Sequence, residues 1–228
     1  MTKKEYGEIE AYMVDNMQDS AHDRHHVYRV LYAAIDISEH EGPVDYDVLL
    51  AACLLHDIGR EKQFSDIENL CHAQIGSEMA YDYLLSQKWQ PQKALHVKEC
   101  ISTHRYRRDN APQSIEAKIL FDADKLDASG AVGIARTLIY GGQTTEPLYI
   151  INDSGEIAVD GGGAELSSFF QEYNYKLKQV YNSFHTVRAK EIALNRQKTA
   201  IDFYNGLFNE ITENYRSKKN IHNILSDE

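Results

Sequence analysis

The sequence predicts an all-α fold: a compact, single-domain helical bundle over residues 1–228, with a glycine-rich loop or short hairpin near 141–163. Apolar residues recur at spacings of three and four, which is the period of an amphipathic helix. The period-two alternation typical of strands is confined to the glycine-rich segment. No internal repeat and no low-complexity linker divides the chain, so one domain is the simplest organisation.

The amino-terminal half is predicted to be helical in five places. A continuous apolar stripe begins at Val27 and belongs to a helix that runs to about Glu39. The run from Val48 to Leu55 is apolar on every side, which indicates a helix in the centre of the core. We expect that helix to end near Gly59, because glycine is a common helix stop. The five predicted helices cover Lys3 to Met17, Val27 to about Glu39, Val48 to about Gly59, His72 to Leu85 and Pro91 to about His104.

The carboxy-terminal half has a helix from Pro112 to about Ala128, with a possible extension through Gly130 to Tyr140. Six of the 13 glycines then fall within 141–163, where a hairpin would pair Leu148–Ile151 with Glu156–Val159. Helical periodicity returns for the C-terminal helices at about 165–215. The polar tail after that is predicted to fray.

Composition and charge narrow the function classes. The net charge of -11 argues against nucleic acid as a partner, because an acidic surface repels a phosphate backbone. A small anionic substrate remains possible, since a bound divalent cation reverses the local field. The three cysteines show no C-x-x-C pair and fit a reducing compartment. With no signal peptide and no apolar run long enough to span a bilayer, we expect a cytoplasmic protein without a membrane partner.

Two candidate metal-ligating positions lie at the edges of apolar helices. His56 and Asp57 end the apolar run, and His26 borders the buried stripe of the preceding helix. Histidine is a common metal ligand, and carboxylates suit harder divalent ions. His56 and Asp57 could instead be a helix-capping histidine and a solvated aspartate. His22 and His25 are near His26, but His25 falls on the polar side of the helix.

Helical phase separates Asp124 from its acidic neighbours. Asp124 continues the apolar stripe that includes Leu120 and Phe121, whereas Asp122 lies about 160° around the helix. Asp127 is one turn beyond Asp124 and could orient a ligand. The alternative for Asp124 is a buried acid paired with an arginine.

These residues, taken in order, resemble the HD superfamily of metal-dependent phosphohydrolases, and specifically a branch of small bacterial HD-domain hydrolases. The resemblance covers most of the chain, and a lone His-Asp pair would be weak evidence without the ordered set. The matching stretches are Asp23-Arg-His-His-Val-Tyr-Arg-Val30, Leu54-Leu-His-Asp-Ile-Gly59, His72-Ala-Gln-Ile-Gly-Ser-Glu78, Ile101-Ser-Thr-His104, Asp122-Ala-Asp-Lys-Leu-Asp-Ala128, Tyr175-Lys-Leu177 and Thr186 to Arg196.

The resemblance implies that His26, His56, Asp57 and Asp124 bind one divalent ion, such as Mn, Mg, Fe or Ni, within a metal core at about 20–130. It also implies hydrolysis of phosphate esters or anhydrides, commonly in nucleotides, including cleavage of nucleoside triphosphates to monophosphate and pyrophosphate. Such an ion lowers the pKa of a water and offsets developing negative charge. Asp57 or Asp127 is the candidate catalytic group that positions or deprotonates that water.

Two further histidines face inward. His104 shares a stripe with Val97 and Ile101, and His72 shares one with Ile75. They could donate hydrogen bonds to a substrate phosphate, hold a second metal, or be satisfied buried histidines. Dinuclear members of the superfamily use extra histidines in this part of the chain, but Arg105 follows His104 where one dinuclear branch has a second histidine.

Basic residues near the predicted site are candidates for substrate binding. Arginine grips phosphate oxygens with two parallel hydrogen bonds. Arg60 follows the His-Asp pair and Lys125 lies inside the matching motif, so these two are favoured. Arg105 begins a cluster with Arg107 and Arg108, for which a solvated loop is the alternative.

The sequence thus predicts a metal-dependent phosphohydrolase of the nucleotidase or nucleoside triphosphate pyrophosphohydrolase type. Two alternatives remain: a metal-holding HD domain that acts as a non-catalytic ligand sensor or scaffold, and a di-iron HD-type oxygenase. The oligomeric state is left open.

Overall fold

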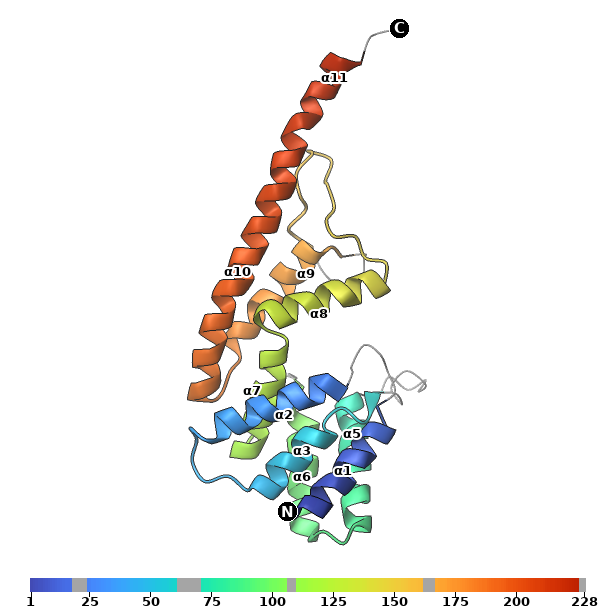
Figure 1. Cartoon of the computed structure of the whole chain (residues 1–228), viewed down its shortest axis with the longest axis vertical. Helices are drawn as coiled ribbons and strands as arrows, with labels where there is room; N and C mark the ends of the chain where they lie inside the picture. The colour runs from blue at the N-terminus through green and yellow to red at the C-terminus, as the bar shows by residue number, and fades with distance from the viewer. Residues whose placement is uncertain (18–23, 61–70, 106–109, 162–166, 226–228) are drawn as a thin grey trace. The chain divides into compact units, whose positions relative to one another are not determined.

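The predicted all-α class is confirmed. A computed structural model describes residues 1–17, 24–60, 71–105, 110–161 and 167–225. Within these ranges the regular structure is helical, and β pairing is limited to one antiparallel bridge between Ile151 and Ile157 (Figure 1). That bridge falls where the sequence predicted a short hairpin.

The described chain forms two compact units, one of residues 1–127 with 184–192 and one of residues 128–183 with 193–228. The prediction of a single domain over 1–228 therefore stays a prediction. All the predicted site residues belong to the first unit. Its helices include α1 (Lys3–Asp15), α2 (Arg24–Ser38), α3 (Tyr46–Leu55), α5 (His72–Ser86), α6 (Pro91–Thr103) and α7 (Ile115–Asp127).

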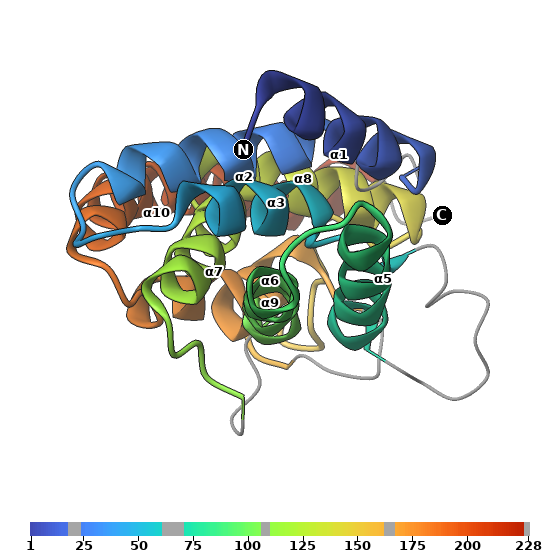
Figure 2. The same ribbon diagram turned by 90° about the horizontal axis from the view of Figure 1, so that it is seen from below.

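Helix α3 is the centre of the first unit, as its apolar run predicted. It contacts α1, α2, α5, α6 and α7, and its residues from Ala51 to Leu55 are fully buried. Asp45 caps its amino end by accepting hydrogen bonds from the backbone N–H groups of Asp47 and Val48. Figure 2 shows α3 beside α2, with α5 and α6 next to each other below it.

The turn after α3 corrects the role predicted for Gly59. The helix ends at Leu55, four residues before the expected stop, and Gly59 has no positive φ. The reason for glycine is close approach: an added Cβ would lie 2.5 Å from the backbone N of Gly76 and collide with the carbonyl oxygen of His72. Glycine here lets α5 pack directly against the turn that carries His56 and Asp57.

Helix α7 buries Asp122, although the sequence placed it about 160° away from the apolar stripe that includes Asp124. Asp122 is fully buried, because the start of α10 (Val187–Arg216) covers that side of α7. Its carboxylate accepts hydrogen bonds from the backbone N–H of His185, the backbone N–H of Thr186 and the Thr186 hydroxyl, at 2.7 to 3.0 Å. A carboxylate at a helix amino terminus satisfies its free N–H groups and complements its dipole.

The second unit begins directly after α7, which does not continue through Gly130 to Tyr140 as a single helix. The helix stops at Asp127, and α8 (Gly130–Gln143) starts anew because Gly130 adopts φ +62°, a value that breaks a right-handed helix. An aromatic core, which includes Phe169, Phe170 and Tyr173, fills this unit. Its other elements are α9 (Phe169–Tyr175), η1 (Leu177–Asn182), the greater part of α10, η2 (Ser217–Asn220) and α11 (Ile221–Ile224).

No helix in the described ranges is long and apolar enough to cross a bilayer. The cytoplasmic location expected from the sequence stays a prediction.

Candidate metal centre

The four predicted ligands come from three helices of the first unit. His26 lies in the first turn of α2, and His56 is the C-cap of α3 with Asp57 next to it in the turn. Asp124 lies in the last turn of α7. His26, His56 and Asp57 are almost completely buried, whereas the Asp124 side chain keeps 19% of its surface exposed.

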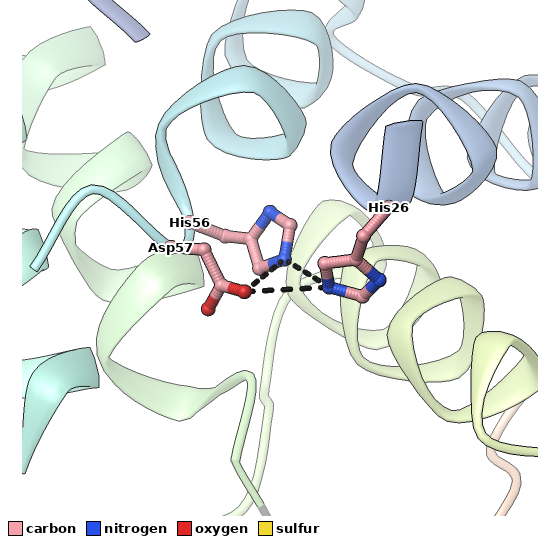
Figure 3. A group of neighbouring side chains, drawn as sticks. All are labelled: His26, His56 and Asp57. Carbon is pink, nitrogen blue, oxygen red and sulfur yellow. Dashed lines mark hydrogen bonds and ion pairs between the residues drawn. The ribbon is translucent and has the colours of Figure 1, made fainter. Parts of the chain in front are cut away.

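The side chains of His26, His56 and Asp57 point toward one another (Figure 3). Ligand atoms of His26, His56 and Asp57 all lie within 4.8 Å of one another, which is the spacing of groups that could hold one metal ion. Nε2 of His26 is 3.3 Å from Oδ2 of Asp57 and 3.4 Å from Oδ1 of Asp124. Nε2 of His56 is 3.3 Å from Nε2 of His26 and 3.6 Å from Oδ2 of Asp57.

Both histidines are oriented through their other ring nitrogen. Nδ1 of His56 contacts the backbone oxygen of Cys53 at 2.8 Å, and Nδ1 of His26 contacts Oδ2 of Asp127 at 2.7 Å. A carbonyl or carboxylate oxygen accepts a hydrogen bond, so each Nδ1 is the N–H donor. Each Nε2 is thereby left to face the cluster, as metal-ligating histidines do.

Three carboxylates surround His26 and determine its electrostatic environment. Burial alone would lower the pKa of His26, but contacts with Asp124, Asp127 and Asp57 outweigh it and raise the pKa to about 10. The pKa of Asp124 is held well below its ordinary value, because the His26 contact outweighs burial. Burial lowers the pKa of His56 to about 4. The cluster therefore favours a cation at Nε2 of His26, where a metal ion competes with a proton.

A second group shares Asp57. Its Oδ1 is 3.6 Å from Nε2 of His72 and 3.6 Å from Nε2 of His104, and these three also have the spacing of a metal-binding group. Asp57 Oδ1 and His104 Nε2 are buried without a hydrogen-bond partner among the described residues. A buried polar atom of that kind is costly unless a ligand satisfies it. The two oxygens of Asp57 thus face two sets of histidines.

Asp127 lies behind His26, on the side away from Asp57. Its carboxylate accepts a hydrogen bond from Nε of Arg29 at 2.6 Å and one from Nη2 at 3.1 Å. The sequence analysis named Asp127 as a candidate orienter but missed Arg29. The signal was present, because Arg29 is three residues after His26 and lies near it on one face of α2.

The predicted basic residues occupy three different environments. Nε of Arg60 donates to Oδ2 of Asp57 at 2.6 Å. Nη1 of Arg105 lies 3.4 Å from Nδ1 of His72. Nζ of Lys125 sits 5.4 Å from the ring centre of Phe121. Their contact with substrate stays a prediction, and Arg107, Arg108 and His22 lie outside the described residues. His25 is exposed, as its helical phase indicated.

Comparison with known proteins agrees with this geometry. Residues 24–129 match the HD domain family, and that range contains every predicted ligand. This segment is similar to an HD domain. The chain is 29% identical over 195 residues to the uncharacterized protein YpgQ of Bacillus subtilis. The match covers 85% of this chain and 86% of YpgQ.

Solved structures with the same HD architecture span nearly the whole chain. The structure of Bacillus subtilis YpgQ in complex with ADP has a TM-score of 0.69 at 26% identity and covers 90% of this chain and 97% of YpgQ. An HD-superfamily hydrolase from Bacillus thuringiensis has a TM-score of 0.69 at 25% identity, with 92% and 98% covered. The chain therefore has the fold of an HD-superfamily hydrolase, together with a histidine and aspartate cluster suited to a divalent metal.

Proposed function

We propose that this protein is a metal-dependent phosphohydrolase that cleaves a phosphate ester or anhydride of a nucleotide. His26, His56, Asp57 and Asp124 would hold one divalent ion. The observation that supports the proposal is that ligand atoms of His26, His56 and Asp57 lie within 4.8 Å of one another, with Oδ1 of Asp124 at 3.4 Å from Nε2 of His26. Burial of so many titratable groups on an apolar face is costly without such a ligand.

A bound divalent ion would lower the pKa of a water and offset negative charge on a phosphoryl oxygen. The chain's own residues prepare the site for this. Asp127 and the Cys53 carbonyl hold the His26 and His56 rings in place. Asp57, whose pKa is held well below its ordinary value by His56 and Arg60 against the effect of burial, stays ionised. An ionised Asp57 would serve as a metal ligand and as a hydrogen-bond acceptor that positions a water, whereas Asp127 acts through His26.

Two observations support a nucleotide as the substrate: the ligand of the related protein YpgQ, and the positively charged arginines near the site. YpgQ is seen with ADP, and an adenine nucleotide has the phosphates that Arg60 and Arg105 are suited to bind. A nucleoside triphosphate cleaved to monophosphate and pyrophosphate is the specific reaction we propose. Lys125, which is partly exposed near the carboxy end of α7, is a third candidate for phosphate contact.

A second ion is the competing arrangement, favoured by the group formed by Asp57, His72 and His104. It would place one ion on each oxygen of Asp57. A metal count per chain separates the one-ion site from this arrangement. It also tests a di-iron oxygenase, which needs two ions.

The test is hydrolysis of a panel of nucleoside triphosphates, monophosphates and an aryl phosphate, each with Mn²⁺, Mg²⁺, Ni²⁺ or Fe²⁺. We expect release of pyrophosphate from a triphosphate, and loss of both metal and turnover in Asp57→Ala. The matched control is Asp202→Ala, at an exposed position of α10. Full activity in Asp57→Ala would overturn the proposal, and nucleotide binding without turnover would favour the sensor alternative.

A further inference from the structure

The four buried histidines of the centre are not equivalent. His26, His56 and His104 each place Nδ1 against an oxygen that only accepts. For His104 the acceptor is the backbone oxygen of Ile101, at 2.6 Å. In the neutral, metal-binding form of all three rings the proton therefore sits on Nδ1, and Nε2 presents a lone pair toward Asp57. These three rings are built as metal ligands.

His72 has the opposite arrangement. Among the described residues, its Nδ1 contacts the guanidinium of Arg105, at 3.4 Å. Arginine has only N–H donors and no acceptor, so Nδ1 of His72 must supply the lone pair. The proton of the neutral ring is then on Nε2, the nitrogen that lies 3.6 Å from Oδ1 of Asp57. A nitrogen that carries a proton cannot bind a metal ion.

We infer that Arg105 fixes His72 as a hydrogen-bond donor to the centre, so that His72 contacts an anionic phosphoryl oxygen of the substrate instead of a second metal ion. The ligand class follows from the neighbours, because an N–H beside the divalent ion favours an anionic oxygen that accepts its hydrogen bond and also coordinates the ion. The inference rests on the proposed function for the identity of that oxygen, but the proton position is a property of the chain alone.

This assignment reduces the second metal group to two ligands. With His72 a donor, Asp57 and His104 remain, one ligand fewer than the smallest set found in catalytic zinc sites. It also gives Arg105 a positioning role, acting through His72, in addition to the phosphate contact proposed above. Arg105 also lies 3.6 Å from Sγ of Cys71, the N-cap of α5, so its guanidinium is held at the start of the helix that carries His72.

The first test is long-range ¹H–¹⁵N correlation NMR on protein labelled at its ten histidines, with Mg²⁺ bound. His72→Gln identifies the His72 signals by their loss. We expect His72 to show the Nε2–H form and His26, His56 and His104 to show the Nδ1–H form. An Nδ1–H pattern for His72 would overturn the inference, whatever the enzyme assay shows.

The second test changes the group at Nδ1. Arg105→Glu replaces a donor with an acceptor, so the His72 proton should move to Nδ1 and a second equivalent of Mn²⁺ should bind. Arg105→Lys is the matched control, because lysine also only donates, and it should keep the Nε2–H form and one equivalent. Two equivalents of Mn²⁺ on the unmodified protein, one of them lost in His72→Gln, would contradict the assignment.

If the unmodified protein hydrolyses a nucleotide, activity gives a third readout. His72→Gln supplies an N–H at similar reach and should lose less kcat/KM than His72→Leu, which should lose about 100-fold, the effect of removing one donor to a developing anion. Equal loss in both variants would contradict the donor role. Absence of hydrolysis in the unmodified protein would count against the proposed function, while the NMR result would still decide the proton position.

Discussion

Oδ2 of Asp127 lies 2.7 Å from Nδ1 of His26, and Arg29 holds the same carboxylate through two further hydrogen bonds. This chain of contacts links α2 to α7 behind the metal centre. It fixes the ring of His26 so that Nε2 points at Asp57 and Asp124. Contacts of this kind are known to tune metal affinity as well as ligand orientation.

Asp127→Asn should weaken Mn²⁺ binding by about 10- to 100-fold, the usual effect of losing a carboxylate behind a ligating histidine. The amide is uncharged, and its nitrogen cannot accept from Arg29 or His26. Isothermal titration with Mn²⁺ measures the change. Asp202→Asn, at an exposed position of α10, is the control. Unchanged affinity in Asp127→Asn would show that His26 is held by packing alone.

Arg60→Gln should strengthen Mn²⁺ binding by about tenfold, or about 1.4 kcal/mol. The guanidinium donates to Oδ2 of Asp57 at 2.6 Å, so its positive charge competes with an ion at the same oxygen. The KM for the nucleotide should rise, because a phosphate contact is lost. Arg188→Gln, which breaks a similar pair with Asp36 elsewhere in the unit, should change neither. Weaker Mn²⁺ binding in Arg60→Gln would instead make Arg60 a positioning residue for Asp57.

Several residues of the metal centre could be predicted from the helical periodicity of the sequence. His26 and His104 were placed inward by the stripes they extend, and both are buried. The helical-stripe argument did not predict the burial of Asp122. It assumes that the side of a helix opposite its apolar stripe is exposed to solvent, whereas α7 is buried on two sides. The Arg29–Asp127 contact could not be predicted either, since it depends on how two helices distant in sequence pack. The break between α7 and α8 depends on the positive φ of Gly130, and hydrophobic periodicity does not reveal the backbone conformation of a single residue.

Gly59→Ala should destabilise the fold and weaken the metal centre together. A methyl group at this position meets the backbone of α5, with Gly76 N at 2.5 Å, and backbone cannot move aside as a flexible side chain can. We expect a loss of about 1–3 kcal/mol in the free energy of unfolding, the usual cost of overpacking, with weaker Mn²⁺ binding. Urea unfolding measures the first effect. Gly7→Ala, in α1 with open space around it, should instead stabilise or leave stability unchanged.

Asp122→Ala should lower the free energy of unfolding by about 2–4 kcal/mol, because two backbone N–H groups and the Thr186 hydroxyl lose their acceptor in a buried place. Asp122→Asn keeps one acceptor oxygen and should lose less. Urea unfolding of both variants, with Asp202→Ala as the exposed control, gives the comparison. A loss below 0.5 kcal/mol in Asp122→Ala, the range of surface substitutions, would show that the start of α10 is held by other contacts.

The most direct measurement is the position of Mn²⁺ in a crystal of this protein, found by anomalous scattering. We predict one strong peak within bonding distance of Nε2 of His26, Nε2 of His56 and carboxylate oxygens of Asp57 and Asp124. A main peak elsewhere, or a second peak of equal height bonded to His72, would contradict the account.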